Sequence, residues 1–165
     1  MDGYSVASWG PAFTATAGAA AALAGLLFVA LSINLKQIIA SRLLVNRAIE
    51  VLVLLAAALL LSTLLLMPGM PANGVAIEII GVAIGTAAVT GFIQIRSDRK
   101  AAGLTAMQFG SRVFGDQVGP LFLVVGGVSL LVQNGGGLYW VVPAILAMII
   151  AALVGAWVLL VEILR

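Results

Sequence analysis

Long apolar stretches alternate with short connectors along the chain, and this pattern dominates the sequence. Gly3 to Leu35 contains no charged side chain, and Gln117 to Val161 runs for 45 residues without one. A helix of about 20 residues crosses the roughly 30 Å of hydrocarbon in a bilayer. A single helix over Gln117–Val161 would be about 67 Å long, so this stretch must turn back.

The pattern predicts an all-α fold, namely one polytopic transmembrane bundle of residues 1–165 with five spans. Pro68–Gly74 and Gln133–Gly137 supply the turns, because Pro, Gly and Asn stop helices and favour tight connections. The predicted spans are about 12–35, 48–67, 75–95, 113–133 and 138–164.

The fourth span has an alternative. Val118–Val132 supplies only 15 apolar residues, so a full crossing must begin near Val113. If it does not, the segment is short or re-entrant and the protein has four spans. Gly115–Pro120 is interpreted as a turn leading into this span, and a helix break that lines a cavity is the alternative.

The positive residues predict the orientation. In a five-span arrangement all eight Lys and Arg residues fall on one side of the membrane. Positive loops favour the cytoplasmic side. The N-terminus is therefore expected outside and the C-terminus inside.

Composition supports a membrane protein and narrows the function classes. Hydrophobic residues make up 63% of the chain and charged residues 8%, whereas soluble domains carry about 25% charged residues. The net charge of +2 does not supply the basic face of a nucleic-acid binder. There is no His or Cys to hold haem or zinc or to serve a hydrolase triad. We expect neither an enzyme nor a cofactor.

Three polar residues within the predicted spans are candidate functional positions. Glu78 lies inside the third span, where an ionisable group is costly and marks a functional site unless it reaches the headgroup layer. Asn34 is interpreted as a cap of the first helix or a hydrogen-bonding partner across helices. Asp116, like Glu50, lies where an acid near a helix N-terminus complements the helix dipole.

Small residues at helical spacing predict where helices pack closely. Gly81 and Gly85 mark the third span, and the fifth span carries Ala147, Ala151 and Gly155. The first span also has small residues, such as Gly18 with Ala22, so these three spans are expected to form the core. The second span is rich in Leu and is expected to face lipid. The small-residue strips serve packing within the bundle or, alternatively, binding of a second protein.

Residues 104–114 are interpreted as a short helix along the inner surface. Its basic neighbours could hold anionic lipid headgroups, or they could only set the topology. The four residues concerned are Arg96, Arg99, Lys100 and Arg112.

The segment Trp9–Leu35, WGPAFTATAGAAAALAGLLFVALSINL, resembles the opening of small uncharacterised bacterial multi-spanning membrane proteins. Ala24–Leu35 is its most distinctive part. The resemblance implies a multi-pass protein of the bacterial cytoplasmic (inner) membrane. It implies no activity and no site residue.

Two functions fit these observations. The first is an accessory or structural subunit that docks sideways to a larger membrane complex, since the chain is small and carries small-residue strips. The second is a homo-oligomeric channel or transporter for ions or small solutes, with Glu78 near its path. In either case the partners are the lipid bilayer and either another membrane protein or further copies of this chain.

Overall fold

The computed structural model describes residues 3–97 and 106–163, and these residues form helices and no strand. Five of these helices are long. A short helix and a 3-10 turn lie in the connections between them, and a second 3-10 turn precedes the first long helix. In chain order the elements are η1 (Val6–Trp9), α1 (Gly10–Ile33), α2 (Leu35–Ile39), α3 (Arg42–Leu64), α4 (Ala72–Arg96), α5 (Ala106–Val132), η2 (Gly137–Tyr139) and α6 (Val141–Ile163).

Five helices among the described residues are long and apolar enough to cross a bilayer, which confirms the predicted number of long apolar helices. The alternative of a short or re-entrant fourth segment is wrong, because α5 is 27 residues long. The expected surface helix over residues 104–114 is also wrong in its described part, since residues 106–114 are the first turns of α5. Residues 104 and 105 lie outside the described residues.

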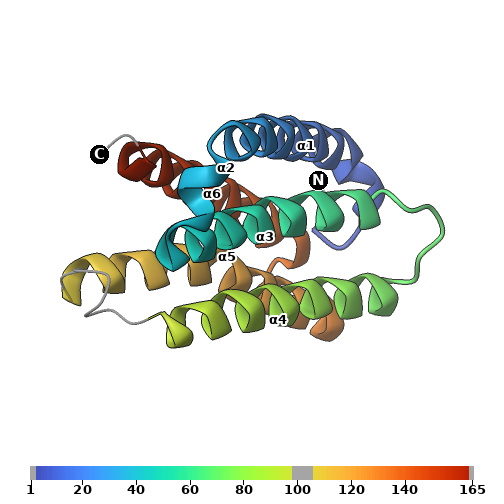
Figure 1. Ribbon diagram of the computed structural model, residues 1–165. Coiled ribbons are helices and arrows are strands. Elements are labelled where there is room, and N and C mark those ends of the chain that lie inside the picture. The colour runs from blue at the N-terminus through green and yellow to red at the C-terminus, as the bar shows by residue number, and fades with distance from the viewer. Residues whose placement is uncertain (1–2, 98–105, 164–165) are drawn as a thin grey trace.

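Four of the long helices form a closed ring, with α1 on its outside. Around the ring, α3 packs on α4, α4 on α5, α5 on α6 and α6 back on α3. Helix α1 packs mainly against α3, so one of its sides faces away from the protein (Figure 1). Consecutive long helices run in opposite directions, which brings the described basic side chains to one end of the bundle. We call this end, where α3 and α5 begin and α4 and α6 end, the inner end.

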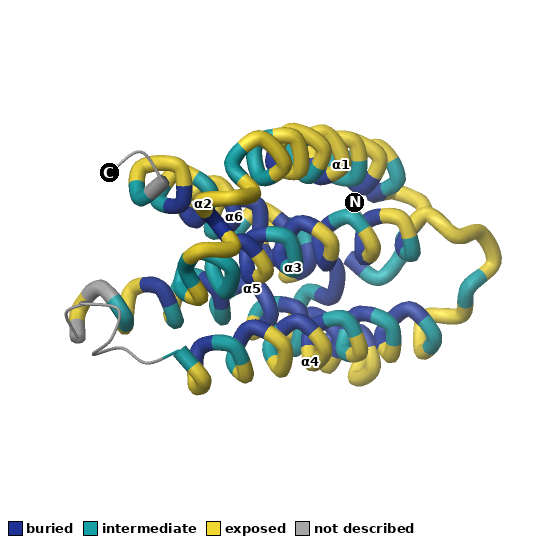
Figure 2. Tube along the Cα trace, in the orientation of Figure 1, coloured by how far each residue is buried: buried dark blue, intermediate teal, exposed yellow. Residues whose placement is uncertain are grey.

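Helix α3 is central, so the expectation that the second span faces lipid is wrong. Leu54 and Leu61 are at most 1% exposed, at the contacts of α3 with its neighbours. Helix α1, predicted to belong to the core, is mostly exposed (Figure 2). Leucine content cannot separate the two cases, because lipid tails and a protein interior are equally apolar partners for a Leu side chain.

The closest helix contacts are made by glycines of α5 and α6. A Cβ atom on Gly119 would collide with Met148 of α6, and one on Gly127 would lie 2.5 Å from Cγ1 of Ile80 on α4. Gly155 of α6 meets Val51 of α3 in the same way. Small residues at these positions let the ring close.

Helix α5 continues through Gly115–Pro120, so the expected turn into the fourth span is wrong. Pro120 lies inside the helix. Proline has no N–H, so it cannot donate the helical hydrogen bond to the carbonyl oxygen of Asp116. The break in the hydrogen-bond ladder thus lies beside a buried carboxylate.

The N-terminal segment is joined to the α5–α6 connection at the other end of the bundle. The backbone N–H of Leu138 donates to the carbonyl oxygen of Gly3 over 2.8 Å, and that of Gly136 donates to the Tyr4 hydroxyl over 3.0 Å. The rings of Trp9 and Tyr139 meet edge to face with centroids 4.9 Å apart. Gly136 has φ +107°, a left-handed conformation that glycine adopts without strain.

The packing makes a prediction for Gly127. Gly127→Val should lower the free energy of unfolding by about 1–3 kcal/mol, because the added atoms overpack the contact with Ile80 and the backbone of Ala76. Gly18→Val on α1 is the matched control, since nothing lies within 4 Å of a Cβ added there. Thermal unfolding in detergent measures both. Equal losses would contradict the close α4–α5 contact.

Candidate functional site

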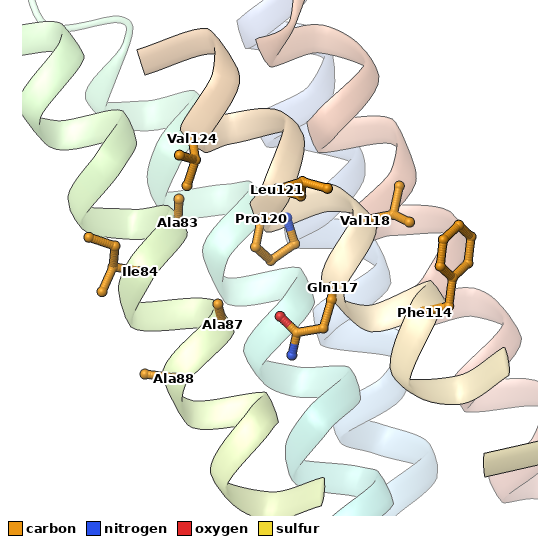
Figure 3. A pocket seen from close by; sticks show the side chains of 10 residues that line it. All are labelled: Ala83, Ile84, Ala87, Ala88, Phe114, Gln117, Val118, Pro120, Leu121 and Val124. Atoms are coloured by element: carbon orange, nitrogen blue, oxygen red, sulfur yellow. The ribbon is translucent and has the colours of Figure 1, made fainter. Parts of the chain in front are cut away.

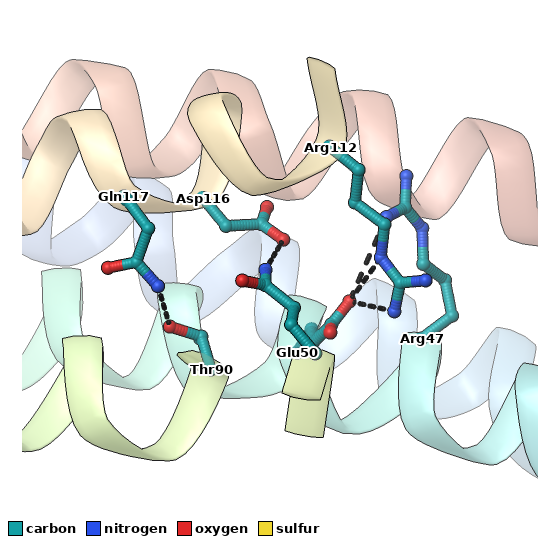
Figure 4. A network of polar contacts seen from close by, with 7 residues as sticks. Arg47, Glu50, Thr90, Arg112, Asp116 and Gln117 are labelled. Atoms are coloured by element: carbon teal, nitrogen blue, oxygen red, sulfur yellow. Dashed lines mark hydrogen bonds and ion pairs between the residues drawn. The ribbon is translucent and has the colours of Figure 1, made fainter. Parts of the chain in front are cut away.

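A buried ion pair joins α3 to α5 in the inner half of the bundle (Figure 4). Glu50 is only 1% exposed. Its Oε2 atom accepts hydrogen bonds from Arg112, at 2.9 Å from Nε and 2.5 Å from Nη2. Arg47, one turn before Glu50 on α3, brings a second guanidinium to 3.7 Å from the same oxygen.

A second set of polar contacts joins α4 to α5 beside this pair. Gln94 donates from Nε2 to Oδ2 of Asp116 over 2.8 Å, and both side chains are buried. One helical turn nearer the middle of α4, Thr90 accepts from Nε2 of Gln117 over 2.9 Å. Asp116 lies four residues after Arg112, so both point from the same face of α5 into the ring.

These contacts form one charged cluster, which we call the inner cluster. Taking a charge out of water costs several kcal/mol unless a partner compensates it, and breaking a buried pair costs about 3–5 kcal/mol. The pairing therefore fixes how α3 and α5 lie relative to one another. The members of the inner cluster are Arg47, Glu50, Gln94, Arg112 and Asp116.

In the inner cluster the carboxylates are paired with arginine and glutamine side chains, and they are not grouped as the ligands of a metal ion would be. Among the described residues no group of three His, Cys, Asp or Glu side chains is placed to hold a metal ion. Glu50 Oε1 is buried with no hydrogen-bond partner among the described residues, although Oε2 is doubly hydrogen-bonded.

Sequence reasoning missed most of this cluster. Glu50 was assigned to a helix N-terminus, but it lies two turns inside α3, and Asp116 lies well inside α5 rather than at its start. The sequence does contain one indication of the cluster, which is the spacing of oppositely charged residues along each helix. Arg47 and Glu50 are three residues apart, and Arg112 and Asp116 are four apart, so each pair shares one helix face.

The other two predicted polar residues lie away from the inner cluster. Asn34 follows the last residue of α1, and its Nδ2 donates to the carbonyl oxygen of Ala30 over 2.9 Å. This contact is local to α1. Glu78 lies on α4 in the outer half of the bundle, half-buried, and its Oε2 atom is buried without a hydrogen-bond partner among the described residues.

The basic residues expected to meet lipid headgroups occupy different environments. Arg112 is buried in the ion pair with Glu50, so it is placed inside the bundle rather than on the inner surface. Arg96 is exposed, and its guanidinium carbon lies 4.2 Å from the centre of the Phe92 ring. Arg99 and Lys100 lie outside the described residues.

The predicted packing residues divide between the inside and the outside of the ring. On α6, Gly155 is buried, and Ala147 and Ala151 are half-buried. On α4, Gly81 and Gly85 are exposed, and nothing lies within 4 Å of a Cβ added at either. The α4 glycines therefore do not pack within this bundle, contrary to the expectation that the third span uses them in the core.

The exposed glycines belong to a longer row on α4. Gly81, Gly85, Ala88 and Phe92 alternate spacings of four and three residues and are all exposed, and we call them the α4 seam. Such spacing keeps one face of a helix against a partner helix. The buried residues of α4, such as Ala83 and Thr90, lie on the opposite side of the helix from the α4 seam.

An apolar groove of about 560 Å³ runs beside the α4 seam, between α4 and α5. Figure 3 shows Gln117 and Pro120 of α5 across from Ala83 and Ala87 of α4. Ala88 belongs to both the groove and the seam. The two features thus form one continuous surface on this side of the bundle.

A comparison of the chain with protein-family models, curated proteins and solved structures finds no match in any of the three. The resemblance of Trp9–Leu35 to small bacterial membrane proteins therefore stays a prediction. The function has to be inferred from contacts, burial and charge.

The ion pair makes a prediction for a double-mutant cycle. Glu50→Leu should lower the free energy of unfolding by about 3–5 kcal/mol, because it leaves two guanidiniums without their shared carboxylate. Arg112→Met should cost less, because Arg47 remains near Glu50. The double variant should be more stable than Glu50→Leu alone. Losses that simply add in unfolding measurements would contradict the coupling.

Proposed function

We propose that this protein is an integral membrane subunit that docks sideways, along α4, to a transmembrane helix of a larger membrane complex. The observation that carries the proposal is the α4 seam, a row of exposed residues with the spacing of a helix-packing face, of which all but Phe92 are small. Helices in lipid associate through close contact of small residues, since apolar side chains gain little by leaving lipid tails.

Two further features favour α4 over the other exposed helix, α1. The groove between α4 and α5 gives the partner a concave surface beside the seam. Glu78, one turn before Gly81, supplies a buried carboxylate oxygen without a hydrogen-bond partner among the described residues. Because this oxygen is covered by the chain's own atoms, a docked helix would reach the carboxylate only after the half-buried Glu78 side chain turns outward. A hydrogen bond to a polar group of that helix would then add to the packing.

The second candidate is a homo-oligomeric channel or transporter for ions or small solutes, in which Glu78 lies near the path. The unpartnered oxygen of Glu78 favours it as well, since ionisable residues within spans often face a pathway or a partner. Self-association through the α4 seam would bring Glu78 of several copies together. Glu78→Gln should then alter flux in liposomes.

The placement in the membrane follows from the charges. Five basic residues of the described part lie towards the inner end, within two turns of the ends of α2, α3, α4 and α5: Lys36, Arg42, Arg47, Arg96 and Arg112. On the positive-inside rule, we propose that this end faces the cytoplasm and that the N-terminus lies outside. A bacterial cytoplasmic membrane is the proposed location. The proposal includes no catalytic step, cofactor or nucleic acid.

Bulky residues on the α4 seam should abolish docking without unfolding the protein. We expect Gly81→Leu with Gly85→Leu to release the protein from its native complex, seen as a drop in native mass after gentle extraction. The matched variant Gly18→Leu with Gly25→Leu changes two equally open glycines of α1 and should leave the complex intact. Release by the α1 pair and not by the α4 pair would contradict docking through α4.

Single thiols identify what the seam contacts. The chain has no cysteine, so Ala88→Cys introduces its only thiol. Crosslinking through Ala88→Cys in the native membrane should give a conjugate with a different protein, whereas Ala22→Cys on α1 should not. A conjugate of two copies of this chain would instead support the homo-oligomeric channel.

A further inference from the structure

A crevice opens between α5 and α6 at the inner end, and it shares Phe114 and Val118 of α5 with the α4–α5 groove. It consists of two neighbouring pockets of about 350 and 340 Å³. Both pockets are lined by Arg47, Ser111, Arg112 and Val154, so they are parts of one space.

The crevice is polar at one end and apolar at the other. Towards the inner end, Glu162 joins the two arginines in lining it. Towards the middle of the membrane the walls are formed mainly by apolar side chains, among them Phe114, Val118 and Ile150, with Asp116 alongside.

The apolar part opens towards lipid. Phe114 is 73% exposed and Ile150 is 59% exposed on the outside of the bundle. In a membrane these side chains meet acyl chains. A lipid tail can therefore lie against this part of the crevice without leaving the bilayer.

The polar part lies at headgroup depth. Arg47 and Arg112 are six or fewer residues from the first residues of their helices, and Glu162 is in the last turn of α6. Six residues of helix rise about 9 Å. The headgroup layers add about 5–8 Å on each side of the hydrocarbon, so these charges lie at the boundary of the two.

The charges at this end are of both signs. Two guanidiniums, of Arg47 and Arg112, face the carboxylates of Glu50, Asp116 and Glu162 from α3, α5 and α6. Glu50 is bonded by Arg112, and Asp116 accepts from Gln94. Glu162 has no ion pair among the described residues, although it lines the same pocket as both arginines. A ligand with only negative charge would meet this carboxylate beside the arginines.

We propose that the crevice binds a zwitterionic aminophospholipid of the bilayer. Its phosphate accepts hydrogen bonds from the guanidiniums of Arg47 and Arg112, its primary ammonium donates to the carboxylate of Glu162, and one acyl chain lies along Phe114 and Ile150. Arginine is suited to phosphate because its planar fork presents several N–H donors. The primary ammonium has three N–H donors, which a quaternary ammonium lacks.

Lipids of matched acyl chains test the headgroup. Native mass spectrometry of the purified full-length protein would compare phosphatidylethanolamine, phosphatidylcholine and phosphatidylglycerol. We expect phosphatidylethanolamine to bind about tenfold more tightly than phosphatidylcholine, the size of one hydrogen bond to a charged group. Phosphatidylglycerol should also bind more weakly than phosphatidylethanolamine. Equal binding of phosphatidylethanolamine and phosphatidylcholine, or preference for phosphatidylglycerol, would overturn the proposal.

Two variants test the assigned contacts. Glu162→Gln should reduce the preference for phosphatidylethanolamine over phosphatidylcholine. Ile150→Trp should weaken the binding of all three lipids, because the larger side chain fills the apolar part of the crevice. Val128→Trp, on the exposed side of α5 away from the crevice, is the control. Thermal unfolding verifies that each variant is folded. An unchanged preference in Glu162→Gln, or loss of lipid in Ile84→Trp at the α4–α5 groove instead of in Ile150→Trp, would refute binding in this crevice.

Discussion

The ion pair between Glu50 and Arg112 constrains the whole bundle. Each of these charges depends on its partners in the protein interior, because taking a charge out of water costs several kcal/mol unless it is paired; Glu50 is 1% exposed and Arg112 is 9% exposed. The pair joins α3 and α5, which face one another across the ring rather than pack as neighbours. Any shift of one helix along its axis by a single turn, about 5.4 Å, would separate the two groups. Apolar packing alone tolerates such a shift far better, because successive turns of a Leu-rich helix present similar surfaces to a neighbouring helix.

The rest of the architecture follows from this constraint together with the glycine contacts. With α3 and α5 fixed, α4 and α6 fill the two sides of the ring, where Gly127 and Gly119 allow them to approach α5 closely. Polar contacts are concentrated at the inner end, and the contact of Gly3 with Leu138 closes the outer end. What remains open is the outward side of α4, the crevice between α5 and α6, and most of α1.

The sequence was sufficient for the number of long apolar helices and their approximate bounds, because a helix that crosses a bilayer needs an apolar stretch of about 20 residues. It was insufficient for which helix is central. Gly81 and Gly85 have the same spacing whether they face a helix of this chain or lipid, and the Leu residues of α3 are equally suited to both. The charges were misplaced for a related reason. Glu50 was expected at the start of the second span and Arg112 among basic residues near the headgroups. Their pairing across 62 positions is visible only in the fold.

The contact between Gly3 and Leu138 has a consequence for how the protein is made. Gly3 leaves the ribosome before any of the helices, but the N–H group from which its carbonyl oxygen accepts belongs to the connection between α5 and α6. The N-terminal segment therefore cannot reach its final position until four spans have been synthesised and the α5–α6 turn has formed. During that time α1 is held only by its contact with α3. Helix α1 is thus synthesised before the other long helices, but the segment that precedes it gains its final contacts only after the α5–α6 connection has formed.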